Sequence, residues 1–376
     1  MTAIERATVL GSGAGALTIA AELGLAGTDV TLADLPSFGN RLDPVADAGG
    51  VRVFYRDRPH LGVQLGPITA TSNDPAAAIP GAPLVIISVP SFGHKPFAEL
   101  LAPVLEDGQT VMWVSEGGGA FESVAALRRI GRRPAVKLAE TNTLPYNGSM
   151  VDAPGSVSTA HKIGGTYVSG LPTRVTEEVA QIASQIWPWA EPATNAWETV
   201  LVNYNAIDHV ATVVANLGTL QSRSDTMLLW GEGASSGVVN VIEAVDADYV
   251  TLRAALGLPT ELRYHDYLVR QGVAAEKGKT LHDTIHVSGL AVARFQCGPE
   301  VLEHRYIAED VPYALVLASS LAAELGVAVP VIDGLIAIVS AAAGKDYRSE
   351  GRTLADWGLE GVGREGLIQA VTDGWW

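Results

Sequence analysis

A glycine-rich turn near the N-terminus constrains the fold more than any other feature of this sequence. The apolar run Ala7–Leu10 leads into Gly11-Ser-Gly-Ala-Gly-Ala16, and a helix-compatible stretch extends from Ala14 to Ala26. In a dinucleotide-binding strand–turn–helix unit, the first glycine makes the tight turn, the second admits the pyrophosphate, and a small third residue allows close packing. The helix start offers free amides to phosphates. A turn without a nucleotide is the alternative. The residues predicted to bind the cofactor here are Gly11, Ser12, Gly13, Ala14 and Gly15.

The first half of the chain alternates short β-branched runs with amphipathic stretches. This β/α alternation is typical of a doubly wound parallel sheet, and it predicts an α/β N-terminal Rossmann domain. Helices are predicted at Ala14–Ala26, Pro96–Leu105 and Phe121–Ile130. Buried strands are predicted at Ala7–Leu10, Val30–Ala33, Leu84–Val89, Val111–Ser115 and Ala135–Leu138.

The second half has a different sequence pattern, in which glycine and proline separate long helix-compatible stretches. The main ones are Thr194–Leu220, Ala234–Leu256 and Val311–Leu325. The segment between Ile186 and Ala193 contains two prolines and is the expected junction. We therefore predict a Rossmann domain over residues 1–186 and a mainly α-helical substrate domain over residues 187–376.

Two strand ends give further expectations about the cofactor. Asp34 follows the second strand, where a carboxylate binds the ribose hydroxyls of NAD and repels the extra phosphate of NADP. A turn role is the alternative for Asp34. Val89 and Pro90 end the strand Leu84–Val89, at the edge where an open sheet binds its ligand. We expect NAD(H) to be preferred, with NADP(H) as the other dinucleotide that the turn could accept.

The composition restricts the partners. The 25 basic and 41 acidic residues give a net charge of −16, and so acidic a surface repels nucleic acids and anionic headgroups. Glu324, Pro330 and Asp333 interrupt the longest apolar region, so no bilayer span is expected. We expect small-molecule partners, no nucleic acid, no membrane and no metal, and a homodimer is compatible with the sequence.

The redox compartment is indicated by cysteine usage. Cys297 is the single cysteine and has no partner for an intramolecular disulfide, and the first residues do not read as a signal peptide. A cytoplasmic location is therefore expected.

A polar stripe marks the first long helical stretch of the second half. Asn205, His209, Thr212 and Asn216 recur at helical spacing, on a different face from the apolar residues. Buried polar groups need a partner, so the stripe predicts one side of a ligand site with His209 as its reactive group and Asn205 as a substrate contact. A hydrogen-bonded core histidine is the alternative. In the first half, Thr143 lies in a loop after a strand and is a candidate substrate contact or a plain turn residue.

A second polar group precedes the stretch Val311–Leu325. Asp310 stands before Pro312 and reads as a helix N-cap, or as the partner of a histidine. Arg305 offers two parallel hydrogen bonds to a carboxylate, which suits an α-keto acid. Its alternative is a surface ion pair with Glu303 or Glu309.

Taken together, these motifs resemble the octopine/nopaline (opine) dehydrogenase family over nearly the whole chain. The residues that carry the resemblance are the glycine turn, Ser88-Val-Pro90, Asn203-Tyr-Asn-Ala-Ile-Asp-His209, Arg305-Tyr-Ile-Ala-Glu-Asp310-Val, Asp346-Tyr-Arg-Ser-Glu-Gly-Arg-Thr-Leu354 and Gly358-Leu. Two departures stand out: Ala14-Gly-Ala-Leu-Thr18 replaces a common Asn-Gly-Gly-His-Ala, and Val210 replaces a common proline after the histidine.

The resemblance implies an NAD(P)-dependent oxidoreductase acting on CH–NH donors. Such enzymes condense an amino acid with an α-keto acid through an imine and reduce it to a secondary amine, reversibly. It implies His209 as general acid/base, Asp310 as the carboxylate that orients it, and Arg305 as the keto-acid clamp. A hydroxyacid or sugar-phosphate dehydrogenase of the same architecture and a non-catalytic NAD(H) sensor remain as alternatives.

Overall fold

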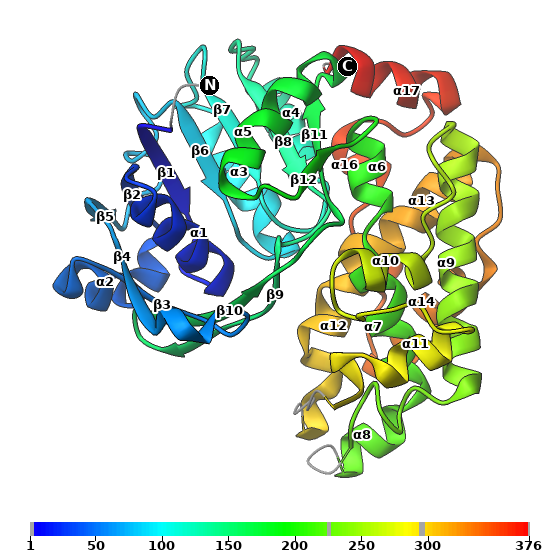
Figure 1. Cartoon of the computed structure of the whole chain (residues 1–376). Helices are drawn as coiled ribbons and strands as arrows, with labels where there is room; N and C mark the ends of the chain where they lie inside the picture. Colours follow the sequence, from blue (N-terminus) through cyan, green and yellow to red (C-terminus); the bar gives the residue numbers. More distant parts are fainter. Residues whose placement is uncertain (1–3, 224–226, 293–297, 375–376) are drawn as a thin grey trace. The chain divides into compact units, whose positions relative to one another are not determined.

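The computed structural model describes residues 4–223, 227–292 and 298–374, so Cys297 lies outside the described residues. The chain forms two compact units: one extends to Thr199 and includes the segment from Ala370, and the other is Val200–Gln369 (Figure 1). The predicted boundary between the Rossmann domain and the substrate domain, at residues 186 and 187, stays a prediction. The first compact unit extends past residue 186 because Trp187 and Trp197 are fully buried in it. Trp187 packs against Tyr146, and Trp197 packs against Phe121.

An eight-stranded sheet forms the centre of the first unit. Its strands, in spatial order, are β12 (Ala190–Pro192), β11 (Thr166–Leu171), β8 (Lys137–Thr141), β7 (Thr110–Trp113), β6 (Leu84–Ile87), β1 (Arg6–Leu10), β2 (Asp29–Ala33) and β5 (Ala70–Ser72). Leu10 pairs with both Ala33 and Ile87, so the residues after β1, β2 and β6 meet at one edge of the sheet. The predicted doubly wound parallel sheet and its five predicted strands are confirmed, and β11 is a further strand that runs antiparallel to β8.

A second, four-stranded sheet was not predicted from the sequence. Its order is β4 (Val63–Pro67), β3 (Gly50–Tyr55), β10 (Ser156–His161) and β9 (Tyr146–Ala153). Helix α1 (Ala14–Leu25) lies between the two sheets (Figure 1). Its approach to β4 is so close that a Cβ on Gly66 would lie 2.4 Å from Ala21 Cα. The missing side chain of Gly66 therefore permits this packing.

The other helices whose residues belong wholly or partly to the first unit complete its layers. They are α2 (Asp43–Ala48), α3 (His94–Leu101), α4 (Gly119–Arg129), α5 (Thr176–Ile186), α6 (Ala196–Leu201) and α17 (Gly363–Asp373). Short 3₁₀ turns occur at Pro36–Arg41, Pro59–Leu61, Ser91–Gly93 and Thr173–Val175. The predicted helices at Ala14–Ala26, Pro96–Leu105 and Phe121–Ile130 correspond to α1, α3 and α4.

The second unit is helical in the residues that the structure describes. Its helices are α7 (Tyr204–Ala215), α8 (Leu217–Arg223), α9 (Ser236–Leu256), α10 (Tyr264–Arg270), α11 (Leu281–Val287), α12 (Arg305–Ala308), α13 (Val316–Leu325), α14 (Pro330–Ala343), α15 (Tyr347–Glu350) and α16 (Leu354–Trp357). A π-helical turn, Val311–Leu315, precedes α13, and short 3₁₀ turns lie at Gly289–Val292 and Gly298–Glu303.

One helical prediction is wrong in this region. The stretch Thr194–Leu220 is not one helix but is divided into α6, α7 and α8. Asn203 leaves the helical conformation, with φ −89° and ψ 89°, and precedes the first residue of α7. Asparagine favours such helix-start positions because its side chain competes for backbone hydrogen bonds. No helix among the described residues has both the length and the apolarity to cross a bilayer.

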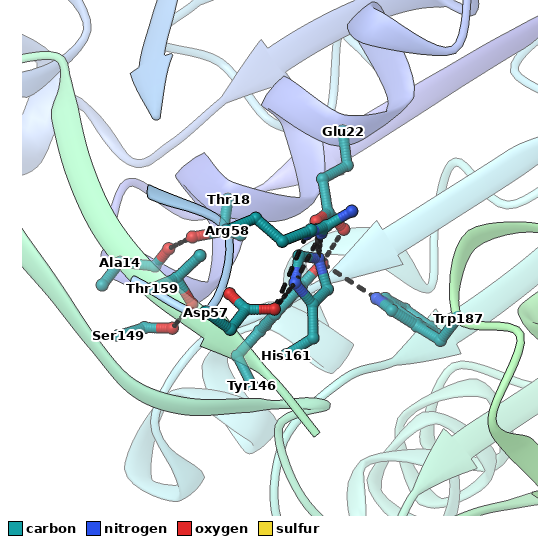
Figure 2. A network of polar contacts seen from close by, with 10 residues as sticks. All are labelled: Ala14, Thr18, Glu22, Asp57, Arg58, Tyr146, Ser149, Thr159, His161 and Trp187. Atoms are coloured by element: carbon teal, nitrogen blue, oxygen red, sulfur yellow. Dashed lines mark hydrogen bonds and ion pairs between the residues drawn. The ribbon is translucent and has the colours of Figure 1, made fainter. Parts of the chain in front are cut away.

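A half-buried polar network ties α1 to the four-stranded sheet (Figure 2). The His161 ring approaches Glu22 Oε1 through Nε2 at 2.6 Å and Asp57 Oδ2 through Nδ1 at 3.0 Å. Tyr146 donates its hydroxyl to Glu22, and Trp187 Nε1 donates to the Tyr146 oxygen at 2.8 Å. Two carboxylates flanking one imidazole favour its doubly protonated form.

This network predicts a pH-dependent contribution to stability. Burial opposes charge on His161, but the Glu22 and Asp57 hydrogen bonds outweigh burial and Arg58, so the pKa of His161 is raised. Burial also opposes charge on Asp57, yet its bond to His161 leaves the pKa of Asp57 lowered. The His161 contribution is complete below the unfolded pKa of about 6.5 and is lost as the pH rises through the folded value. The Asp57 contribution is lost only as the pH falls through its lowered pKa.

We therefore expect the free energy of unfolding to fall between about pH 6 and pH 9, with His161→Gln removing much of that fall. At about pH 6 the substitution should cost on the order of 2 kcal/mol, the scale of hydrogen bonds to charged groups. Urea unfolding at both pH values measures this, with the exposed His60→Gln as control. Equal pH dependence in the His161→Gln variant and the wild type would disprove the charge assignment.

Candidate active site

The glycine turn has the backbone geometry that a dinucleotide requires. Gly11 has a φ of +113°, and a Cβ there would lie 2.5 Å from the Ser88 carbonyl oxygen, so only glycine fits. Gly13 is the N-cap of α1 and no side chain caps that helix end. A Cβ on Gly13 would meet nothing within 4 Å. The amides at the start of α1 are therefore open to an anion, as a pyrophosphate site needs.

Asp34 is held at the end of β2 beside this turn. Its carboxylate is buried, Oδ2 accepts a 2.5 Å hydrogen bond from Ser12 Oγ, and Oδ1 accepts one of 2.7 Å from the Leu35 amide. Val89 is half-buried after β6, and Pro90 is exposed. The structure thus brings Gly11, Ser12 and Asp34 to one edge of the sheet, and these residues fit a dinucleotide whose ribose binds a carboxylate.

Loops after β7 and β8 lie at the same edge. Glu140 is fully buried at β8, and its Oε2 accepts hydrogen bonds from the amides of Gly118 (2.9 Å) and Ala120 (3.1 Å) at the start of α4. His94 Nε2 lies 2.8 Å from Ser115 Oγ. Thr143, the predicted substrate contact, is buried, and its hydroxyl accepts a hydrogen bond from Lys162 Nζ at 3.1 Å. These contacts fix the loops that follow the two strands.

In the second unit, His209 and Asp310 form a buried pair. His209 lies on α7, and its Nδ1 is 2.9 Å from Asp310 Oδ2; the side chains are 11% and 2% exposed. Asp310 makes no side-chain capping bond to the π-helical turn that it precedes. A carboxylate at Nδ1 fixes the ring orientation and stabilises the imidazolium, and it leaves Nε2 to exchange a proton.

Aromatic residues complete the surroundings of His209. Tyr306 stacks on the imidazole with 3.5 Å between ring centroids and 17° between planes. Asp208 Oδ1 lies 3.9 Å from His209 Nε2, and Asp208 Oδ2 accepts hydrogen bonds from Trp230 (3.0 Å) and Tyr264 (2.7 Å). Burial raises the pKa of Asp208, although His209 and both donors oppose the shift. The stacked ring and the bonded carboxylate both restrict the motion of the imidazole.

Arg305 and the polar stripe take different roles. Arg305 is the first residue of α12, its side chain is 61% exposed, and Nε lies 3.5 Å from Glu309 Oε2, the ion pair considered above as its alternative. Asn205 is half-buried on α7. Thr212 donates to the Asp208 carbonyl at 2.5 Å, and Asn216 donates to the carbonyls of Thr212 and Gly233 at 2.9 Å. Thr212 and Asn216 therefore bind backbone carbonyls. His209 and Asn205 are the two residues of the stripe that remain candidates for contact with a ligand.

The sequence reasoning missed several groups at these sites. Asp208 and Tyr306 are adjacent in the chain to His209 and Arg305, so inspecting the neighbours of those motif residues could have found them. Trp230 and Tyr264 carried no signal, because only the packing of α7 against later segments brings them to Asp208. Lys162 also carried no signal, because only tertiary packing brings it to Thr143.

A Rossmann-type domain with an open glycine turn, followed by a helical domain with a buried histidine–aspartate pair, is the architecture of a two-domain dehydrogenase. Residues 192–343 match the family model of the α-helical domain of NAD/NADP octopine/nopaline dehydrogenase. The opine dehydrogenase of Arthrobacter sp. (strain 1C) is 29% identical over 367 residues, covering 96% of this chain and 98% of that protein. Octopine dehydrogenase of Pecten maximus is 24% identical, with 81% of each chain covered.

A solved octopine dehydrogenase, described as a complex with NADH and L-arginine, superposes with a TM-score of 0.80 at 18% identity over 98% of both chains. At that identity the superposition shows the fold. Residues 192–343 are thus similar to the helical domain of the octopine/nopaline dehydrogenase family, and the similarity to the Arthrobacter protein extends over nearly the whole chain.

Proposed function

We propose that this protein is an NAD(H)-dependent opine-type dehydrogenase, which joins the amino group of an amino acid to an α-keto acid and reduces the resulting imine to a secondary amine. The buried His209–Asp310 pair, within a region similar to the helical domain of this family, carries the proposal. The open glycine turn and buried Asp34 support the choice of a dinucleotide cofactor.

The cofactor would be held at the carboxyl edge of the eight-stranded sheet. Gly11 makes the tight turn, Gly13 leaves room for the pyrophosphate, and the start of α1 supplies amides to it. Asp34 binds the ribose hydroxyls, and Val89 and Pro90 border the nicotinamide. NADH, when bound, supplies the hydride that reduces the imine carbon.

Within the helical unit, His209 carries the proton chemistry. In the condensation direction the imidazolium donates its Nε2 proton to the departing carbonyl oxygen, which leaves as water when the imine forms. Asp310 stabilises the imidazolium through Nδ1. Arg305 binds the keto-acid carboxylate after leaving its exposed pair with Glu309. Asn205 is the substrate contact proposed in this unit, and Thr143 is the one proposed in the first unit. In the oxidative direction, neutral His209 accepts a proton from water.

The proposal is tested by a matrix of amino acids and α-keto acids in which the absorbance of NADH is followed. We expect NADH to be consumed only when both substrates of an active pair are present. Consumption with a keto acid alone would identify a hydroxyacid-type dehydrogenase instead. Binding of NADH without consumption in any combination would identify a sensor.

The cofactor preference gives a prediction of its own. Because buried Asp34 places a negative charge where the 2′-phosphate of NADPH would lie, NADH should be preferred by kcat/KM. Asp34→Ala should narrow the preference by at least about tenfold, which corresponds to a loss of about 1.4 kcal/mol of discrimination. Asp29→Ala, which changes an exposed aspartate at the start of β2, is the control. Equal use of both cofactors by the wild type would contradict the assignment.

Small molecules are the expected partners, and the cytoplasm is the proposed location because one cysteine suits a reducing compartment. A homodimer remains a proposal that sedimentation can test.

A further inference from the structure

Asp208, the residue before His209 on α7, has a carboxylate whose two oxygens lie in different surroundings. Oδ2 accepts hydrogen bonds from Trp230 Nε1 at 3.0 Å and from the Tyr264 hydroxyl at 2.7 Å. Oδ1 lies 3.9 Å from Nε2 of His209. Asp208, Trp230 and Tyr264 are all buried, so the two donors hold the carboxylate in place beside the imidazole.

His209 therefore lies between two carboxylates of the same unit. Asp310 Oδ2 lies 2.9 Å from Nδ1, and Asp208 Oδ1 lies near the other ring nitrogen, Nε2. When Nδ1 donates to Asp310, a neutral ring places the lone pair of Nε2 beside the Asp208 oxygen, which is unfavourable. A proton on Nε2 replaces that repulsion with attraction. An ionised Asp208 thus favours the imidazolium at the nitrogen that exchanges a proton in the proposed reaction.

The hydrogen bonds to Asp208 favour its ionised form. Burial raises the pKa of Asp208. The charge of His209 opposes this rise, as do the hydrogen bonds from Tyr264 and Trp230. Both donors bind the same oxygen, and donors to a carboxylate stabilise it over the carboxylic acid. Asp208 and the imidazolium therefore stabilise each other's charge.

The titratable groups of α12 and the residue before it add little charge at the ring. Tyr306 stacks on the imidazole, and burial raises its pKa, so its hydroxyl is neutral. Burial, together with the charges of Arg305 and His209, lowers the pKa of His304 to about 4, so His304 is neutral near pH 7. Arg305 is 61% exposed and pairs with Glu309.

The other elements that pack against α7 carry charged residues that bind other groups. On α9, α14 and α8 they are Asp246, which pairs with Arg263; Asp248, which accepts the amides of Val331 and Ile332; Arg253, which donates to the carbonyls of Pro259 and Leu262; Asp333, which pairs with Arg348; and the exposed Arg223. Asp208 and Asp310 are therefore the carboxylates whose contacts with the His209 ring nitrogens define its electrostatics.

We propose that Asp208 is a positioning residue for the proton transfer: its fixed carboxylate keeps Nε2 of His209 protonated, so that the imidazolium can donate to the departing carbonyl oxygen. The inference rests on the proposed function, which assigns that transfer to His209. One proton passes from Nε2 to the oxygen, and Asp208 itself neither gains nor loses one. The competing explanation is a structural carboxylate that only ties α7 to Trp230 and Tyr264.

The test first measures the protonation of His209 in the full-length protein. Protein with ¹⁵N-labelled histidine is titrated with pH by NMR, and the His209 signals are identified by their loss in His209→Ala. In Asp208→Asn the amide carries no charge, so the titration midpoint of His209 should fall by about one pH unit or more. A structural carboxylate would leave the midpoint unchanged.

The pH dependence of kcat gives a second readout. Where both rings are protonated, at low pH, the kcat of Asp208→Asn should lie within about threefold of the wild-type value. As the pH rises past the midpoint of the variant, the ratio of variant to wild-type kcat should fall by about tenfold, since the variant loses its imidazolium first. A purely structural loss would lower this ratio equally at every pH.

Two further variants keep the result interpretable. Tyr264→Phe keeps the ring but removes one donor to Asp208, so it should lower the His209 midpoint in the same direction by about a few tenths of a unit. It decides the question if Asp208→Asn does not fold. Asp248→Asn changes another buried aspartate of this unit, and it should leave both the midpoint and the kcat ratio unchanged across pH.

An unchanged His209 midpoint in Asp208→Asn, or in Tyr264→Phe if the first variant does not fold, would overturn the inference. A kcat ratio that is the same at every pH would also overturn it. The proposed function is judged separately, by NADH consumption in the wild type. Turnover with an unchanged midpoint refutes the role of Asp208 alone. A lowered midpoint without turnover refutes the proposed reaction and leaves the effect of Asp208 on His209 supported.

Discussion

Replacing His209 with alanine should lower kcat by about 10²–10⁴-fold, because the variant lacks the group that exchanges a proton with the substrate oxygen. The affinity for NADH should stay within about twofold, since the glycine turn and Asp34 belong to a different unit of the chain from α7. Steady-state kinetics with a saturating substrate pair, together with NADH titration, measures both quantities.

The matched control is His286→Ala, an exposed histidine on α11 that should leave kcat unchanged. A His209→Ala variant that kept more than about a tenth of wild-type kcat would leave His209 as a core histidine, because proton transfer is generally worth more than that. Loss of NADH binding would instead indicate that the substitution disturbs the fold.

Asp310→Asn should lower kcat by about 10²-fold or more while leaving folding intact. The amide has the same shape as the carboxylate, but it cannot stabilise an imidazolium, and it can orient the ring in the wrong tautomer. The pH dependence of kcat should shift toward lower pH on the limb that reports the protonated imidazole, because the imidazolium has lost its partner charge.

A capping role would give a different result. Asp346 is a true cap, since its side chain accepts a hydrogen bond from the Arg348 amide at 3.2 Å, so Asp346→Asn is the control that should keep full activity. If Asp310→Asn also kept near-normal turnover with an unchanged pH profile, the proposed pair would be wrong.

Sequence patterns predicted the buried parallel strands because each is a short apolar run that follows or precedes a turn. Strands β1, β2, β6, β7 and β8 were all located in this way. The four-stranded sheet was not predicted, and its strand β9, Tyr146–Ala153, lacks that pattern because most of it is exposed or half-buried. The reversed direction of β11 is set by its pairing with β8, which no local signal encodes.

The residues of the candidate site also differ in whether the sequence could predict them. The glycine turn and Asp34 could be predicted because their spacing along the chain is itself the signal. His209 and Asp310 are 101 residues apart, so only the resemblance to a known family connected them before the structure placed them 2.9 Å apart. Tyr306, Trp230 and Lys162 gain their meaning from tertiary packing, since an aromatic or basic residue taken alone predicts nothing.

The most direct test of the proposed reaction follows the hydride into the product. The protein is incubated with an amino acid labelled with ¹⁵N, a keto acid and NADH carrying deuterium at the transferred position, and the product is analysed by mass spectrometry and NMR. We predict a secondary amine in which the deuterium lies on the carbon derived from the keto acid, and the ¹⁵N is bonded to that carbon. A deuterated 2-hydroxy acid with the amino acid left unchanged would contradict the proposal.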